Sequence, residues 1–274
     1  MEYWNHEGSV DPNKFEKINF TIVAPGNNNR EVWGIRGTVL GDLIYVCGGQ
    51  KKGGGIEKAC WTASINGGGW TQIESMLFGR FKFTFNTVGN RLVVTGGYNP
   101  HEKWFTSVEI FTLEKGWNKA NWSLPYVMGQ VCAVDISGDE IIMISRNETN
   151  DGLAANKFNI DTGARTGLPV PPQETPGSTI LCSKYKESIY VLNCKPDGWN
   201  KLWKVNMDTM DWEPLPEFRD AYAPDSGQFA VVAGIPTYFG AKVRILKKNV
   251  WQYGTQLRVA KYQEIASGGI VVLD

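Results

Sequence analysis

A pair of short apolar segments joined by a turn recurs along the chain and constrains the fold more than any other feature. In the clearest copy, residues 80–97, three phenylalanines alternate with other residues, a turn follows at Val88–Arg91, and Leu92–Thr95 runs into a glycine pair. This pattern predicts a β-hairpin. The copies have turn positions 48, 49, 48, 41 and 41 residues apart, at Gly41, Gly89, Gly138, Lys186, Gly227 and Gly268. Strand repeats of this size are typical of propeller blades.

Each hairpin is followed by a second predicted strand pair that ends near a bulky side chain. The residues at this place are Trp70, Trp117, Arg165, Trp212 and Trp251. A turn precedes each of them, so one unit is interpreted as four antiparallel strands, named a to d from the ring axis outward. Tryptophans repeated at a fixed phase are expected to pack between blades, because a packing requirement produces such a repetition.

The two ends of the chain resemble complementary halves of one unit. Residues 1–25 copy the second half, with Phe15 in the tryptophan place, and residues 258–274 copy the first half. Either half alone would leave an unpaired sheet edge, so we expect the two to form a sixth blade. The sequence therefore predicts a single domain over residues 1–274, an all-β, six-bladed β-propeller of four-stranded antiparallel blades closed by its termini.

The repeat resembles that of the kelch-repeat β-propeller family over essentially the whole chain. Gly48–Gly49 and Gly96–Gly97 match the glycine doublet of that family, and Asp208–Trp212 matches its later motif. Units three to six lack the doublet in place, unit three lacks the tryptophan, and the fifth unit is short, so these copies are recognised mainly by their spacing. The resemblance implies the fold without identifying a subfamily.

Charge and hydropathy bear on the class of partner. The 28 basic and 28 acidic side chains cancel, which argues against nucleic acid or an anionic membrane as partner. No apolar run approaches the about 18 residues of a membrane span, and no charged-then-apolar leader opens the sequence. We expect a cytoplasmic monomer, with secretion as the alternative if a signal peptide has been removed.

Cysteines and glycosylation patterns are relevant to the compartment. The cysteines are Cys47, Cys60, Cys132, Cys182 and Cys194. Most lie in or beside predicted strands, where a thiol acts as a small hydrophobe, so reduced cysteines are favoured over a disulfide framework. The Asn-x-Ser/Thr patterns begin at Asn19, Asn121 and Asn147. Chance predicts about as many in a chain of this composition, so they are no argument for secretion.

The sequence lacks the patterns of common catalytic and metal sites. His6 and His101 are its only histidines, and Gly97 stands four residues before His101, where plant specifier proteins of the kelch type have an acidic residue. There is no Cys-x-x-Cys, phosphate loop or nucleophile elbow. Ser64–Trp70 is close to the Asp-box turn of sialidase-like propellers, which is structural. We therefore expect no cofactor, no metal and no catalytic residue.

The candidate binding residues belong to the predicted b-to-c and d-to-a loops. These loops emerge together around one end of the central channel, here called the loop face. Arg80, Arg219 and Arg258 fall within one residue of the same repeat position and would gather there, where guanidinium groups bind carboxylates or phosphates bidentately. The aromatic candidates are Tyr98, Trp104, Tyr126, Trp199 and Tyr238. Of these, Trp104, Trp199 and Tyr238 are expected to be exposed and to act as rigid contacts.

These residues favour a non-catalytic recognition module that holds a protein segment with an acidic determinant on the loop face. Part of this interpretation is analogy with the fold, because propellers carry many functions. One alternative is a carbohydrate- or sialic-acid-directed propeller that binds or isomerises sugars, and another is an actin- or scaffold-associated structural propeller. A packing alternative also stands, in which the arginine stems fill gaps between blades.

Overall fold

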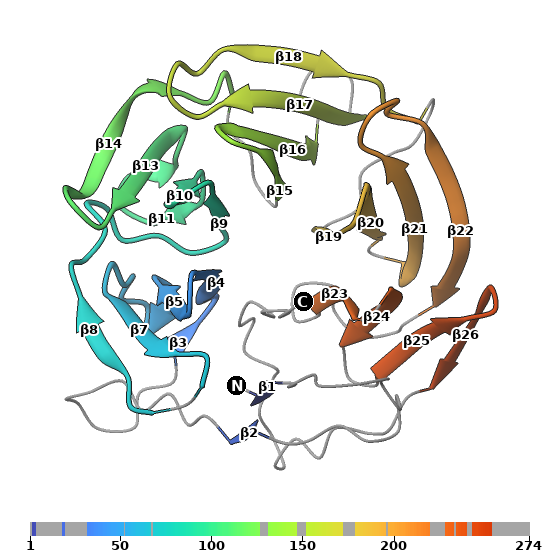
Figure 1. Cartoon of the computed structure of the whole chain (residues 1–274), viewed down its shortest axis with the longest axis horizontal. Coiled ribbons are helices and arrows are strands. Elements are labelled where there is room, and N and C mark those ends of the chain that lie inside the picture. The colour runs from blue at the N-terminus through green and yellow to red at the C-terminus, as the bar shows by residue number, and fades with distance from the viewer. Residues whose placement is uncertain are drawn as a thin grey trace.

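The computed structural model describes residues 2–3, 18–19, 32–51, 53–66, 68–126, 131–146, 152–171, 179–195, 197–219, 228–232, 234–239 and 243–253. Within these ranges, five four-stranded antiparallel sheets stand as blades around a ring (Figure 1). The all-β propeller predicted from the repeat is therefore confirmed for the described part of the chain. No helix in these ranges is long and apolar enough to cross a membrane.

Each blade is a meander whose strands follow one another from the axis outward. Blade 1 contains β4 (Arg36–Leu40), β5 (Leu43–Cys47), β7 (Cys60–Ser64) and β8 (Thr71–Ile73). Blade 2 contains β9 (Thr84–Val88), β10 (Arg91–Thr95), β13 (Ser107–Thr112) and β14 (Gly116–Ser123). Blade 3 contains β15 (Cys132–Ser137), β16 (Glu140–Arg146), β17 (Leu153–Asn159) and β18 (Arg165–Leu168). Blade 4 contains β19 (Thr179–Tyr185), β20 (Ser188–Cys194), β21 (Trp199–Asn206) and β22 (Trp212–Arg219). Blade 5 contains β23 (Gln228–Val232), β24 (Ile235–Phe239), β25 (Val243–Lys247) and β26 (Val250–Tyr253).

The turn between the first two strands requires a left-handed backbone, which explains the repeated glycine. Its φ angle is +59° at Gly41, +60° at Gly89 and +56° at Gly138, and Lys186 takes +52° in blade 4. Glycine adopts such angles without a steric penalty, whereas a lysine there is uncommon. The hairpins predicted from these turns are present in blades 1 to 4.

Blade 5 corrects one part of the predicted repeat. The sequence interpretation placed its turn at Gly227, but β23 begins at Gln228 and pairs with β24 around Gly234, whose φ is +77°. Gly234 lies 48 residues after Lys186, so the blade keeps the regular spacing. The two glycines were confused because each borders the same apolar run.

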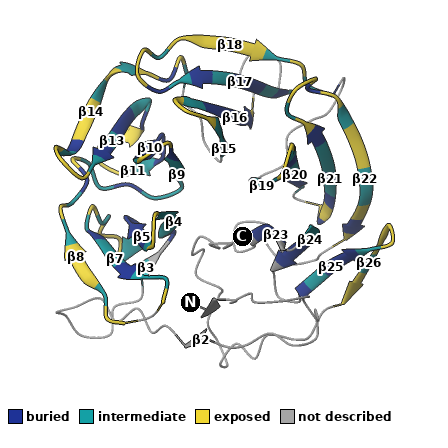
Figure 2. Ribbon diagram, viewed as in Figure 1, coloured by how far each residue is buried: buried dark blue, intermediate teal, exposed yellow. Residues whose placement is uncertain are grey.

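The hydrophobic core lies between neighbouring blades. Figure 2 shows buried segments concentrated in the middle strands and exposed segments on the outermost ones. Ile141–Ile144 of β16 are all buried, because blades 2 and 4 cover its two faces. A continuous apolar run in a short strand is the expected signature of such two-sided burial.

Three of the repeated tryptophans connect a blade to the one before it. The indole N–H of Trp117 donates to Glu74 O at 3.1 Å, that of Trp212 to Pro169 O at 2.9 Å, and that of Trp251 to Pro216 O at 2.6 Å. Each donor stands at or near the start of a fourth strand, and each acceptor belongs to the preceding blade. The packing role predicted for these three tryptophans is therefore confirmed.

The boundary between blades 2 and 3 uses a different tryptophan, because Arg165 stands where blade 3 would have one. Trp122 at the end of β14 stacks on Phe158 with ring centroids 5.9 Å apart and donates its indole N–H to Ile160 O at 2.9 Å. Its ring also lies over Gly163, where a Cβ atom would come 2.5 Å from Trp122 Cγ. The sequence analysis missed Trp122, because it falls outside the repeated phase.

Near the axis, polar side chains join each first strand to the next. The contacts are Thr38 Oγ1 with Thr87 Oγ1 at 3.1 Å, Asn86 Nδ2 to Ala133 O at 2.8 Å, Lys184 Nζ to Asp135 Oδ2 at 3.2 Å, and Val231 N to Ser183 Oγ at 3.0 Å. The partners are 49, 47, 49 and 48 residues apart, which is one repeat each time. The repeat period is therefore also the period of the contacts that hold the ring.

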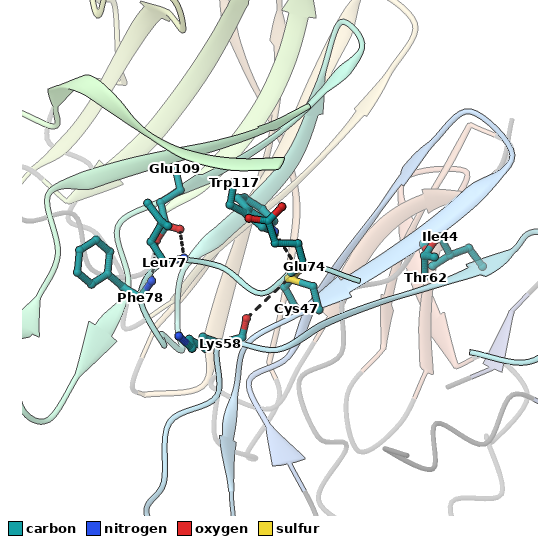
Figure 3. The surroundings of a disulfide bond; sticks show 10 residues. Ile44, Cys47, Lys58, Thr62, Glu74, Leu77, Phe78, Glu109 and Trp117 are labelled. Atoms are coloured by element: carbon teal, nitrogen blue, oxygen red, sulfur yellow. Dashed lines mark hydrogen bonds between the residues drawn. A yellow bond between two sulfur atoms is a disulfide. The ribbon is translucent and has the colours of Figure 1, made fainter. Parts of the chain in front are cut away.

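Two disulfides correct the prediction that the cysteines are reduced. Cys47 and Cys60 are bonded across β5 and β7, where they are direct partners in register (Figure 3). Cys132 and Cys182 are bonded between β15 and β19, the first strands of blades 3 and 4. Cys194 is buried and belongs to neither bridge. The spacing in sequence indicated strands, but it did not show which cysteines face one another.

We expect the bridge between blades to contribute more stability than the bridge within blade 1. The paired cysteines are 50 residues apart in the first case and 13 in the second. In the chain-entropy account, the longer loop adds about 1 kcal/mol to a typical contribution of about 2–5 kcal/mol. Urea unfolding of Cys132→Ser/Cys182→Ser should therefore show a larger loss than that of Cys47→Ser/Cys60→Ser. Non-reducing peptide mapping supplies the control, and wild-type protein with unchanged stability in reductant would contradict the prediction.

The predicted sixth blade falls mostly outside the described residues, which include neither 4–17 and 20–31 nor 254–274. Within the N-terminal half of that blade, β1 (Glu2–Tyr3) pairs antiparallel with β2 (Ile18–Asn19). In Figure 1 these two strands lie in the interval of the ring between blades 1 and 5.

Candidate functional site

Arg80 lies inside blade 2 and not on the loop face. Its side chain and that of Glu109 are both 0% exposed, and Arg80 Nη2 donates to Glu109 Oε1 at 2.5 Å. Arg80 Nη1 donates to Gly96 O at 2.6 Å, and the guanidinium carbon lies 4.5 Å from the centroid of the Phe105 ring. No ligand at the surface can reach this group, so the predicted ligand role of Arg80 is corrected to a structural one.

The Arg80–Glu109 pair also fixes the segment between blades 1 and 2. Glu109 accepts hydrogen bonds from the backbone N–H of Leu77 at 2.6 Å and of Phe78 at 3.4 Å (Figure 3). Burial lowers the pKa of the Arg80 guanidinium, and the charge of Glu109 opposes that effect. A guanidinium keeps its proton in proteins, so the buried carboxylate always faces a cation.

We expect Arg80→Ala to destabilise the protein by about 3–5 kcal/mol, because it removes the cation that faces the buried Glu109 side chain. Arg219→Ala, at an exposed position, should change stability by less than about 0.5 kcal/mol. Guanidinium chloride unfolding measures both. The double variant Arg80→Met/Glu109→Leu should recover much of the loss, because it removes both charges together. Similar losses for Arg80→Ala and Arg219→Ala would contradict the structural role.

Trp199 and Arg219 form an exposed pair at the loop-face end of blade 4. Trp199 begins β21 and Arg219 ends β22, and the two are direct partners in register. Arg219 is exposed, and Trp199 is 42% exposed. Residues opposite each other in an antiparallel ladder point to the same side of the sheet. The structure therefore brings together two candidates that are 20 positions apart in sequence; we call them the Trp199–Arg219 pair.

The backbone around this pair is fixed on both strands. Trp199 N donates to Asp197 Oδ1 at 3.0 Å, and Lys195 N donates to Trp199 O at 3.1 Å. Arg219 O accepts a hydrogen bond from Arg244 Nη2 of blade 5 at 2.8 Å. The Arg244 guanidinium in turn lies over the rings of Phe218 and Tyr253, at 5.2 and 4.8 Å from their centroids. The sequence analysis missed Arg244, because blade 5 was placed out of phase.

Tyr98 and Trp104 lie on a separate hairpin of blade 2. It consists of β11 (Tyr98–Asn99) and β12 (Lys103–Trp104). Trp104 is 39% exposed, as expected, and its ring meets Tyr98 edge to face at 5.1 Å. Tyr98 contacts Phe81 in the same manner at 5.6 Å, and Asn99 Nδ2 donates to Gly79 O at 2.8 Å. This hairpin thus presents Trp104 from a packed base.

The remaining candidates do not join either group. Tyr238 is only 2% exposed and packs on Phe218 with centroids 5.2 Å apart, so its predicted exposure is wrong. Its strand β24 is the second strand of blade 5, inside the sheet. Tyr126 accepts a hydrogen bond from Asn156 Nδ2 at 3.3 Å and packs against the core between blades 2 and 3. Arg258 lies outside the described residues.

The predicted arginine ring is therefore not formed by the arginines that can be described. Arg80 lies nine residues before Gly89, the turn of its blade. Because the turn of blade 5 is at Gly234, Arg219 is not in the equivalent position and belongs to the last strand of blade 4. Among the residues that the structure describes, no group of three or more His, Cys, Asp and Glu side chains could hold a metal ion.

Comparison with known proteins supports the fold alone. No family model matches the chain, and no curated protein matches its sequence significantly. In all, 506 chains of solved structures match its fold. One of them, titled "Structure of YjhT", has a TM-score of 0.67 and 13% identity, over 88% of this chain and 87% of that one. The chain thus has a β-propeller fold, and its kelch type stays a prediction.

Proposed function

We propose that the protein is a non-catalytic recognition module that binds an acidic segment of a partner protein at the Trp199–Arg219 pair. The observation that carries the proposal is the pairing of these two residues in register at the loop-face end of blade 4, where both are exposed. Arg219 makes no ion pair with any described residue, so a carboxylate of a partner can occupy its fork.

The chemistry of the pair matches an acidic peptide. An arginine fork binds a carboxylate through two parallel hydrogen bonds, and an exposed tryptophan supplies a rigid apolar contact beside it. The backbone contacts of both residues remove part of the entropy cost of binding. The same pair would also suit an acidic sugar, whose carboxylate would bind the arginine while its ring stacks on the tryptophan, so the carbohydrate-directed alternative stays the second candidate.

A fluorescein-labelled peptide of alternating glutamate and glycine should bind the protein at low salt and lose affinity as salt rises, because charge attraction is screened over about 8 Å at physiological ionic strength. Trp199→Ala should cost about 2 kcal/mol of binding and Arg219→Ala about 1 kcal/mol, measured by fluorescence anisotropy. Arg219→Lys keeps the charge without the fork and should rescue only part of the loss.

The matched control is Arg165→Ala, which removes another exposed arginine, from the outermost strand of blade 3. It has the same net charge as Arg219→Ala and should leave the affinity unchanged. Equal losses of affinity in the two variants would mean that the peptide binds by non-specific charge attraction, and this would contradict the proposal. A peptide that does not bind at low salt would have the same consequence.

We further propose that residues 1–25 and 258–274 complete a sixth, kelch-type blade. The antiparallel pair β1–β2 and its place in the ring support this closure. Deletion of residues 1–25 should then expose strand edges and abolish cooperative unfolding, as followed by circular dichroism during heating. A truncated protein that melts like the full chain would contradict a sixth blade.

We also propose that the protein matures in an oxidising compartment, the alternative that the sequence analysis left open. The two disulfides support it, because such bonds persist mainly in secreted proteins. Each bond forms when two thiols lose two protons and two electrons to a disulfide of an oxidoreductase, which becomes a dithiol.

A further inference from the structure

The outer strand of blade 2 carries one of the three Asn-x-Ser/Thr patterns at its end. Residues Asn121, Trp122 and Ser123 close β14, which is the outermost strand of its sheet. Asn121 and Ser123 are exposed, whereas Trp122 is half-buried against blade 3. The alternation of a strand thus turns the tryptophan inward and leaves the two polar residues of the pattern at the surface.

The edge of β14 differs from that of the equally long β22 in blade 4. Strand β22 contains Pro214 and Pro216, which cannot donate a backbone hydrogen bond to an added strand, whereas β14 contains no proline. A long outer edge without such protection can pair with another chain. Lys119 in β14 is exposed and opposes this pairing by charge. A bulky polar group near its end would oppose it further.

We infer that Asn121 is a site of asparagine-linked glycosylation. The inference is carried by the exposed Asn121–Ser123 pattern on an outer strand. The two disulfides are compatible with it, because the lumen in which this modification is made is one of the oxidising compartments where such bonds persist. The inference rests on the proposed compartment and is independent of the proposed peptide ligand.

The modification is a transfer from a polyprenyl-pyrophosphate-linked oligosaccharide. The bond between sugar C1 and the pyrophosphate oxygen breaks, a bond forms between C1 and Asn121 Nδ2, the amide loses one proton, and the lipid pyrophosphate leaves. The structure leaves room for the product, because Asn121 faces solvent on the outer rim. In Figure 1, β14 lies across the ring from β22 and β26, so the glycan would not cover the Trp199–Arg219 pair.

The other two patterns carry less structural support. Asn147 lies outside the described residues, and although Asn19 belongs to β2, the surroundings of its side chain are not described. Asn121 is therefore the position for which the exposure of both the acceptor and the hydroxyl residue is known.

The test is to secrete the full chain from insect cells and to map its peptides by mass spectrometry before and after treatment with an amidase that releases asparagine-linked glycans. We expect a glycan on the peptide that contains Asn121, and conversion of that residue to aspartate on release. Ser123→Ala should abolish occupancy while Asn121 itself remains, and Ser123→Thr should preserve or increase it. Absence of the glycan from secreted, disulfide-bonded wild-type protein would overturn the inference.

A second measurement separates the glycan from folding. Ser123→Ala changes an exposed side chain, so its thermal midpoint in bacterially produced, unglycosylated protein should equal that of the wild type. Loss of occupancy in a variant that folds normally then reports on the pattern alone. Retention of a glycan at Asn121 in Ser123→Ala would equally contradict the assignment, and peptide binding should be the same with and without the glycan.

Discussion

Side-chain hydrogen bonds one repeat apart hold the first strands of the ring together, and the rest of the molecule depends on that spacing. Asn86 reaches the backbone of β15, Lys184 reaches Asp135 of the same strand, and Ser183 reaches β23. These contacts form because equivalent positions in the first strands of neighbouring blades lie side by side. The period near 48 residues is thus shared by the contacts near the axis and by the sequence repeat.

The fold could be predicted because its determinants are local. A left-handed turn favours glycine, as at Gly41, Gly89 and Gly138, and a strand buried on both faces favours a continuous apolar run. Neither depends on which blade lies beside which. Blade 5 shows the limit, because two glycines border one apolar run and only strand pairing identifies Gly234 as the turn. The cysteine pairs likewise depend on facing partners, which spacing alone does not reveal.

The site was less predictable, because whether an arginine side chain is buried or exposed depends on its partner and not on its repeat position. Glu109 lies two residues before Phe111, the partner of Trp117, and Arg244 lies two residues before Leu246, the partner of Trp251. The same place in the third strand thus holds a carboxylate in blade 2 and a guanidinium in blade 5. In blade 2 that carboxylate draws Arg80 into the interior. In blade 5 the guanidinium supports the carbonyl of Arg219, whose side chain stays exposed.

This difference between blades 2 and 5 distinguishes a structural arginine from the arginine of the proposed binding site. The buried Arg80–Glu109 pair holds the segment between blades 1 and 2 at Leu77 and Phe78. Arg80 therefore has a structural role. At the boundary of blades 4 and 5, Arg244 donates to the backbone carbonyl of Arg219, and the Arg219 side chain stays exposed. Asp197 holds the backbone N–H of Trp199, so the backbone of both residues of the pair is fixed. In the proposed function, this reduces the conformational entropy lost on binding. The repeat therefore determines the framework, and the candidate site lies where blade 5 has a guanidinium in place of the carboxylate of blade 2.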